Sequence, residues 1–164
     1  MKRRTLLKGI AASAAGGLLA RPALADTTLK IGLSLPLTGA GFTAVGRELT
    51  GALKVYMQQH GDTVAGRKIE LTIRDDAGVG DNARRLVQEM IVNDKVDIVG
   101  VGVTPCALAI APVVTEAKKA CIVMSSGASI TTTKSPYFFR AGFILPPQSW
   151  MLAEWAFKDR KRHV

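Results

Sequence analysis

Hydroxyl and glycine residues follow two apolar segments of the chain, where they could bind a small anion. Val103-Thr104-Pro105 comes after the apolar run 96–101, and Ser125-Ser126-Gly127-Ala128-Ser129 comes after the run 121–124. Pro105 suits the first position of a helix, so free backbone N–H groups and a partial positive charge would face the same place. Donors of this kind favour a small carboxylate. From the residues alone, the alternative that they are only caps and turns stays open.

No catalytic constellation is evident in the sequence. His60, in a predicted turn, and His163 are far apart, and neither has a Cys or Ser at the spacing of a nucleophile. Asp75 and Asp76 end a predicted strand and could hold a metal together with Asp81, but the glycines between them favour turn capping. We therefore expect no enzymatic activity, no metal site and no cofactor.

The two cysteines, Cys106 and Cys121, are the only candidates for a disulfide or a thiolate metal site. About 15 residues of predicted helix separate them, on the order of 20 Å, whereas a disulfide needs Cα atoms within roughly 7 Å. Their spacing matches no zinc pattern. We expect two small buried residues with free thiols.

Two glycine-rich segments match phosphate-binding loops only in part. Thr38-Gly39-Ala40-Gly41 follows the first predicted strand, but Ala44 stands where a dinucleotide fingerprint has its third glycine. The segment 61–68 carries Arg67 and Lys68 in place of the Lys-Ser/Thr pair of a P-loop, and it precedes a strand instead of following one. Turn formation accounts better for both. A Rossmann-type nucleotide-dependent enzyme nevertheless remains the alternative to a binding protein.

Strand-like and helix-like segments alternate from residue 29 onward, which predicts an α/β fold: an open, mostly parallel sheet with helices on both faces. The unbroken apolar runs are typical of strands in the middle of the sheet, whereas the alternation in 68–75 indicates a half-covered or edge strand. Pro112 should kink the third helix or mark its true start. The predicted strands are 29–35, 68–75, 96–101, 121–124 and 137–140, and the predicted helices begin at about 47, 81, 105 and 146.

Composition and charge argue for a globular protein without a nucleic-acid partner. The 164 residues are 48% hydrophobic and 21% charged, which suffices for a domain with a core. The formal net charge is +9, but five of the 22 basic residues lie in the first 25 positions, which contain no acidic residue. A further cluster over 158–162 carries four basic residues against Asp159, and the body between the two basic segments is nearly neutral, with no basic stripe that could follow a phosphate backbone.

Residues 1–25 have the pattern of a cleavable export signal. A basic start precedes an apolar stretch over 10–20, and Ala23-Leu24-Ala25 places small residues where a signal peptidase cuts, so we expect cleavage after Ala25. Arg3 and Arg4 begin a segment similar to the twin-arginine motif. We therefore expect the twin-arginine translocase to export the chain to the periplasm. The sequence after residue 25 contains no run of 18 consecutive apolar residues, so we predict no membrane span there.

An ordered set of short motifs resembles the leucine/isoleucine/valine-binding proteins of ABC importers. The motifs are Pro36-Leu37-Thr38-Gly39, Thr50-Gly51-Ala52, the segment 66–71 with Asp75-Asp76, Met124 to Ser129, and Phe139-Arg140. The resemblance covers essentially all of the chain after the signal. It implies lobe one of a type I periplasmic-binding-protein fold over 26–143. It also implies that 144–164 forms the crossover and first helix of lobe two, where we expect the chain to be cut short.

The resemblance also implies a function and a set of ligand contacts. Family members are extracytoplasmic receptors that deliver an amino acid, branched-chain or related, to the membrane permease of an ABC importer. Carried over by position, Thr104, Gly127 and Ser129 hold the charged end of the ligand. The aromatic residue that the family has before Gly46 is Val45 here, and Phe42 is a possible substitute.

Three further expectations follow from the resemblance. The family's cystine has no counterpart, because Gly78 and Val103 occupy its positions. One lobe alone should bind ligand only weakly, and the identity of the ligand is not readable because the other lobe largely sets selectivity. A sensory receptor lobe for an amide or amino acid shares the fold and stays an alternative to a transport receptor.

Overall fold

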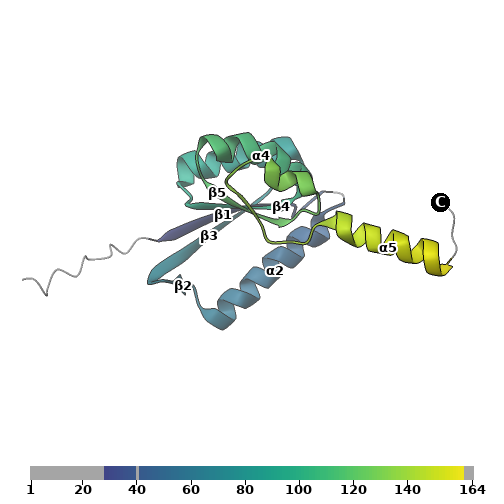
Figure 1. The fold of residues 1–164 in the computed structure, drawn as a ribbon. Coiled ribbons are helices and arrows are strands. Elements are labelled where there is room, and N and C mark those ends of the chain that lie inside the picture. Colours follow the sequence, from purple (N-terminus) through teal and green to yellow (C-terminus); the bar gives the residue numbers. More distant parts are fainter. Residues whose placement is uncertain (1–27, 40, 161–164) are drawn as a thin grey trace, which may run out of the picture.

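A six-stranded sheet forms the centre of the computed structural model, which describes residues 28–39 and 41–160. The predicted signal lies outside these residues. The strand order is β2-β3-β1-β4-β5-β6, and all neighbours are parallel except the hairpin of β2 and β3 (Figure 1). The bounds are β1 (Leu29–Leu35), β2 (Thr63–Val64), β3 (Arg67–Asp75), β4 (Ile98–Val103), β5 (Ala120–Ser125) and β6 (Phe138–Arg140).

Helices cover both faces of the sheet, as predicted. Helix α2 lies on one face, and α3 and α4 lie side by side on the other (Figure 1). Helix α3 continues as a π-helical turn, η1, and a short 3-10 helix, η2, precedes β6. The bounds are α2 (Thr43–His60), α3 (Gly80–Glu89), η1 (Met90–Asp94), α4 (Thr104–Glu116), η2 (Ser129–Thr133) and α5 (Leu145–Arg160).

The hydrophobic core lies between the sheet and the pair α3 and α4. Alternate residues of β4 and β5 point into it, and the apolar stripes of the two helices pack against them. Fully buried members are Val87, Met90, Val99, Val101, Cys106, Ile110, Val114, Cys121 and Val123. Each of these two helices thus turns one apolar face toward the sheet.

Helix α2 begins at Thr43, four residues before the predicted start at Arg47. The Thr43 hydroxyl donates to the Gly39 carbonyl at 2.7 Å, which supports an earlier first turn. Gly46 makes the early start possible, because a Cβ there would lie 2.1 Å from the Pro36 carbonyl oxygen. Only glycine allows the helix to approach the end of β1 this closely.

Two other predictions need correction. Helix α4 runs through Pro112 from Thr104 to Glu116, so the alternative that Pro112 marks its true start is wrong. The strand β2 was not predicted, because it has two residues and belongs to a hairpin whose loop, Ala65 and Gly66, has positive φ at both positions. That hairpin explains the glycine-rich segment 61–68 as a turn.

The strand order contains a switch point between β1 and β4. The chain passes from β1 to β3 on one side and then crosses back to β4 on the other. The central pair is therefore β1 and β4, with β5 next, so the prediction of the middle strands holds for β4 and in part for β5. In open α/β sheets, ligands bind outside the carboxyl ends of the strands at such a point.

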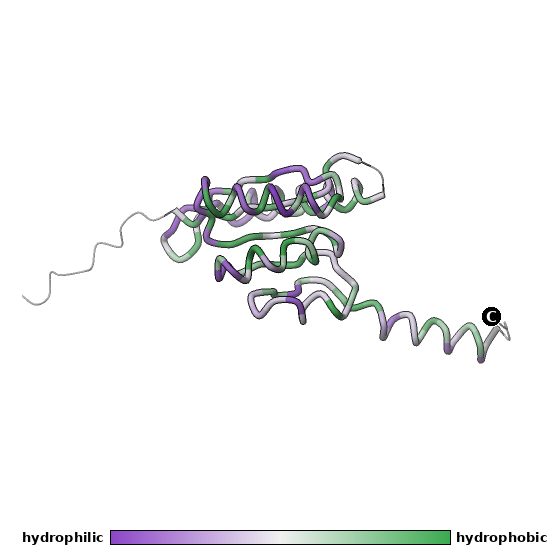
Figure 2. The backbone as a smooth tube through the Cα atoms, turned by 90° about the horizontal axis from the view of Figure 1, so that it is seen from above, coloured by the Kyte–Doolittle hydropathy of each residue, from purple (hydrophilic) through white to green (hydrophobic). Residues whose placement is uncertain are grey.

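Helix α5 extends away from the sheet (Figures 1 and 2), with hydrophobic and hydrophilic residues mixed along its length (Figure 2). Trp150, Met151 and Leu152 are 74%, 70% and 64% exposed on it. Of the helices in the described ranges, none joins the length and the apolar character that a bilayer crossing requires.

Candidate functional site

A hollow of about 710 Å³ opens at the carboxyl ends of β4 and β5, next to the switch point. Helix α2 forms one wall, the strand ends form the floor, and the segment before α5 forms the other wall. Phe42, Thr104 and Gly127 line the hollow, whereas Ser129, the fourth predicted contact, does not. The full lining is Phe42, Val45, Glu48, Leu49, Ala52, Val103, Thr104, Pro105, Met124, Ser125, Ser126, Gly127, Gly142, Phe143, Leu145 and Gln148.

A chain of three hydroxyl groups forms the polar floor of the hollow. The Thr104 and Ser126 hydroxyl oxygens lie 2.7 Å apart, and the Ser126 hydroxyl lies 2.7 Å from that of Thr131. Ser126 and Thr131 are buried, whereas Thr104 is partly exposed. Each hydroxyl both donates and accepts, so the chain can present a donor at Thr104 to an acceptor in the hollow.

Thr104 does not cap α4, so the alternative that it serves only as a helix cap is wrong for this residue. The N-cap residue is Val103, and Thr104 is the first helical residue. Its hydroxyl is engaged by Ser126 in place of the backbone. The side chain is therefore directed across the strand ends, toward the loop after β5.

The loop after β5 offers two backbone donors. The Gly127 carbonyl accepts from Leu145 N–H at 2.9 Å, and the Ala128 carbonyl accepts from Thr131 N–H at 3.3 Å. Within the described part of the chain, the N–H groups of Gly127 and Ser129 have no hydrogen-bond partner. Gly127 is half-buried, where an N–H group normally has a partner, so its N–H is available to a ligand in the hollow, whereas Ser129 is exposed and lies outside the hollow's lining.

Gly127 is required by close packing. A Cβ there would lie 2.3 Å from Cγ of Leu145, the first residue of α5. Together with the hydrogen bond between the same two residues, this contact fixes the segment before α5 against the loop. The wall and the floor of the hollow are thus held to each other at Gly127.

Asp75 holds the loop that leads to Phe42. Its carboxylate accepts from the N–H groups of Leu37, Thr38 and Ala77 at 2.8, 3.2 and 2.9 Å, and from the Thr38 hydroxyl at 2.5 Å. Burial acts to raise the pKa of Asp75, but these bonds, with the Thr38 hydroxyl first, outweigh it and lower the pKa to about 2. The carboxylate therefore organises a turn, the role that the sequence favoured over metal binding.

Phe42 packs beside this turn, on the Gly78 side. A Cβ at Gly78 would lie 3.3 Å from Cδ2 of Phe42.

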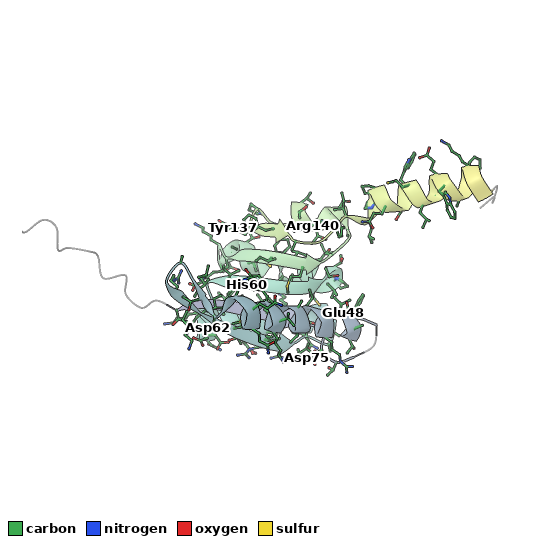
Figure 3. The ribbon with its side chains drawn as sticks, turned by 90° about the horizontal axis from the view of Figure 1, so that it is seen from below. Glu48, His60, Asp62, Asp75, Tyr137 and Arg140 are labelled. Carbon is green, nitrogen blue, oxygen red and sulfur yellow. The ribbon has the colours of Figure 1, made fainter. Side chains whose placement is uncertain are left out.

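Figure 3 shows Asp75 and Glu48 toward the end of the sheet from which α5 leaves, and Asp62 toward the other end. His60 lies at the far end of α2 against Tyr56, with ring centroids 4.4 Å apart, and does not line the hollow.

These features coincide with a known family. The family model described as periplasmic binding protein matches residues 28–164. The chain belongs to the periplasmic binding protein family. Its open α/β sheet is the lobe architecture that the sequence resemblance implied.

Two solved structures and a curated relative illustrate what this periplasmic binding protein is similar to. A solute-binding protein of an ABC transporter from Rhodopseudomonas palustris BisB5, in complex with 3,4-dihydroxybenzoic acid, is 49% identical, with a TM-score of 0.78 over 82% of this chain and 37% of that chain. The leucine-binding protein LivK from Thermotoga maritima MSB8 is 28% identical, with a TM-score of 0.75 over 82% and 38%.

The curated relative is the Leu/Ile/Val-binding protein homolog 6 of Brucella abortus (strain 2308), which is 31% identical over 136 residues. That match covers 82% of this chain and 34% of the relative, so the chain spans about a third of the length of the relatives it matches. All three are described as binding proteins, not enzymes. The expectation that the chain is not an enzyme is therefore confirmed.

The periplasmic binding protein also carries a buried carboxylate in the turn after β3. Asp76 is fully buried and accepts from the Ser34 hydroxyl at 2.7 Å and from Gly78 N–H at 2.8 Å. Burial, the charge of Asp76 and a hydrogen bond to it raise the pKa of Cys106 to about 12, and burial raises the pKa of Cys121 to about 12. Both thiols are free and buried, as predicted.

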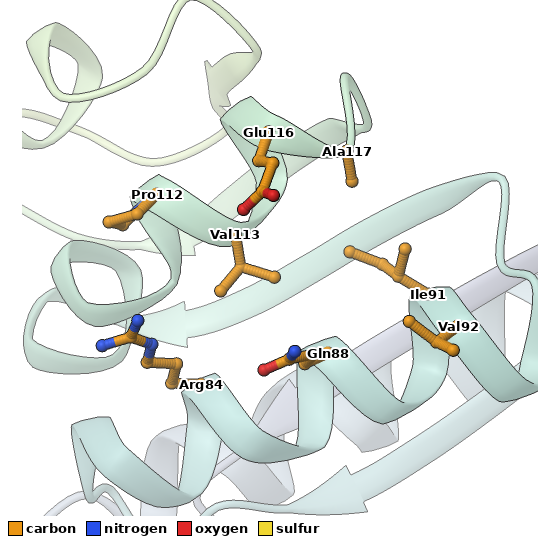
Figure 4. A pocket seen from close by; sticks show the side chains of 8 residues that line it. All are labelled: Arg84, Gln88, Ile91, Val92, Pro112, Val113, Glu116 and Ala117. Carbon is orange, nitrogen blue, oxygen red and sulfur yellow. The ribbon is translucent and has the colours of Figure 1, made fainter.

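A second depression lies between α3 with η1 and α4 (Figure 4), on the face of the sheet opposite α2 (Figure 1). Its volume is about 300 Å³, and helical side chains such as Gln88, Ile91, Val113 and Glu116 line it. It contains none of the predicted ligand contacts. In the ranges that the structure describes, no three His, Cys, Asp or Glu residues come together as a metal site would require.

Sequence reasoning missed several residues of the hollow. The sequence indicates Ser126 only as part of a hydroxyl-rich segment, and it does not single out Leu49 or Ala52 as ligand contacts. The signal that could have identified Ser126 is its position directly after the last residue of a central strand. Glu48, Met124 and Phe143 carried no such signal.

Proposed function

We propose that this chain provides the first ligand-binding lobe of an extracytoplasmic receptor that delivers a small carboxylate to the permease of an ABC importer. The observation that carries the proposal is the grouping of the partly exposed Thr104 hydroxyl with two backbone N–H groups that have no partner among the described residues, at the carboxyl ends of β4 and β5. Thr104, Gly127 and Ser129 supply these donors, which together suit a carboxylate. Membership of the binding-protein family supports the same reading.

The proposed division of the chain follows the same logic. Residues 26–143 form the lobe, and 144–164 form the crossover and first helix of a second lobe. The large exposed side chains of α5, including Trp150 at 74%, support this division, because such side chains normally pack against other parts of a protein.

An aromatic hydroxy acid is the ligand that we favour over an amino acid. The relative with 49% identity was solved with 3,4-dihydroxybenzoic acid, whereas the leucine-binding relative is 28% identical. Phe42, Leu49, Met124 and Phe143 give the hollow an apolar wall that suits a ring. The second candidate is a branched-chain amino acid, because Glu48, the one carboxylate among the described residues that line the hollow, could accept hydrogen bonds from a ligand's ammonium group.

Isothermal calorimetry on the full chain separates these candidates. The panel is 3,4-dihydroxybenzoate, 4-hydroxybenzoate, leucine, isoleucine and NAD. We expect binding of the hydroxybenzoates with a dissociation constant in the micromolar to millimolar range, since one lobe covers only part of a ligand. Binding of NAD alone, or of none of these compounds, would refute the proposed function.

Export to the periplasm by the twin-arginine translocase, with cleavage after Ala25, is part of the same proposal. The family supports an extracytoplasmic location. Changing Arg3 and Arg4 together to Lys should leave uncleaved precursor in the cytoplasm. Normal export of this variant would instead point to the general secretion pathway. A permease gene beside the receptor gene would favour transport over a purely sensory role.

A further inference from the structure

Arg140 donates hydrogen bonds to two backbone carbonyls of the loop after β5. It is the last residue of β6, and its guanidinium donates to the Ser126 carbonyl and, at 2.6 Å, to the Ala128 carbonyl. The planar fork of a guanidinium fits two acceptors at once, which the ammonium of a lysine does not reproduce. Figure 3 shows Arg140 nearer than Tyr137 to the start of α5. The position of the loop is therefore fixed by the Arg140 side chain at two of its backbone carbonyls.

The two carbonyls belong to the peptide units that carry the free N–H groups. The Ser126 carbonyl shares its peptide with Gly127 N–H, and the Ala128 carbonyl shares its peptide with Ser129 N–H. No peptide bond in the described chain is cis, so in each unit the N–H points away from the carbonyl and hence away from Arg140. A donor bound to the carbonyl polarises the peptide and makes its N–H a stronger donor.

Arg140 also brings a positive charge to this loop. It is partly buried, and within the described ranges no carboxylate forms an ion pair with it. The charge is thus not cancelled by a paired acid. Partial burial also leaves it less screened than an exposed charge would be.

We propose that Arg140 is a positioning residue that makes the loop after β5 selective for a carboxylate. It orients the Gly127 and Ser129 peptides, strengthens their N–H groups as donors and adds positive charge behind them. This inference rests on the proposed function, because it concerns the same site. The preference of the site for an anionic over a neutral ligand then depends on Arg140, a residue that does not line the hollow.

The test compares 3,4-dihydroxybenzoate with the neutral 3,4-dihydroxybenzamide on Arg140→Gln, Arg140→Lys and a control. The control is Lys134→Gln, which removes an exposed charge close in sequence without a bond to the loop carbonyls. NMR titration of the isotope-labelled full chain gives both affinities and the amide proton shifts of Gly127 and Ser129. Because it also measures weak binding, it suits a single lobe.

We expect Arg140→Gln to weaken carboxylate binding about tenfold or more and amide binding about twofold or less, as expected for losing charge assistance. Arg140→Lys should fall between Arg140→Gln and the unchanged chain, and Lys134→Gln should leave both affinities within about twofold. In the ligand-free Arg140→Gln chain, the Gly127 and Ser129 amide protons should move upfield.

Equal losses for the two compounds would show that Arg140 only holds the fold, and would overturn the inference while leaving the proposed function intact. Unchanged carboxylate affinity in Arg140→Gln would also overturn it. If the unchanged chain binds neither compound, the proposed function fails first, and the assignment of Arg140 to ligand selectivity fails with it.

Discussion

The hydroxyl oxygens of Thr104 and Ser126 lie 2.7 Å apart and join the start of α4 to the loop after β5. Ser126 is buried and its hydroxyl also lies 2.7 Å from that of Thr131, so Thr104 is the more exposed end of this hydroxyl chain at the hollow. The geometry makes Thr104 the exposed end of a hydroxyl chain that is otherwise satisfied inside the protein. Its removal should therefore affect binding more than folding.

Thr104→Val should weaken binding of 3,4-dihydroxybenzoate roughly tenfold to a hundredfold, the loss expected for one hydrogen bond to a charged group, about 1.5 to 3 kcal/mol. Ser126 keeps its bond to Thr131, so the melting temperature should change little. Calorimetry and thermal unfolding measure the two effects. Thr133→Val is the matched control, because among the described residues the Thr133 hydroxyl bonds only to the Ile130 carbonyl. Equal affinities in the two variants would remove Thr104 from the site.

Ser129→Ala should weaken the same ligand about tenfold while keeping the backbone N–H. The Ser129 hydroxyl has no hydrogen-bond partner among the described residues, so a folded chain does not need it. The measurement is again the dissociation constant by calorimetry. An unchanged constant would restrict the contribution of Ser129 to its N–H group.

Asp75→Asn should destabilise the chain at neutral pH and flatten its stability between pH 4 and 2. The pKa of Asp75 is lowered from 3.8 to about 2 in the folded chain, so its stabilising effect is complete above pH 4 and is lost as the pH falls through about 2. Thermal unfolding across this range measures the difference. The control is Asp81→Asn, because the carboxylate of Asp81 has no hydrogen-bond partner among the described residues. Parallel stability curves for Asp75→Asn and the unchanged chain would contradict the role of Asp75.

Cys106 and Cys121 should resist thiol reagents in the folded chain. Both are fully buried, and the pKa of each is raised to about 12, so almost no thiolate exists at pH 8. A chromogenic disulfide reagent should react slowly with the native chain. After denaturation, it should react rapidly with both thiols. Rapid reaction of either thiol in the native state would show that the core around α4 opens readily.

The fold was largely predictable from the sequence, because apolar periodicity determines which segments form strands and helices. The runs that became β4 and β5 and the stripes of α3 and α4 are of this kind. The hairpin strand β2 was not, since it depends on Ala65 adopting a positive φ, which nothing in the local sequence indicates.

The site was predictable only in part. Thr104 and Gly127 follow strand ends, where residue type and position both indicate ligand binding. The hydroxyl chain through Ser126 and the hold of Arg140 on the loop join segments that are distant in sequence. Such contacts arise from tertiary packing and have no local signal.

The most direct test of the proposed ligand site is to map 3,4-dihydroxybenzoate binding on the isotope-labelled full chain by NMR. If Thr104, Gly127 and Ser129 bind the carboxylate, the largest amide shifts fall at these three residues, with smaller shifts along the α2 wall near Phe42 and Leu49. Shifts centred on the depression near Gln88 and Val113, or no shifts up to the solubility of the ligand, would contradict it.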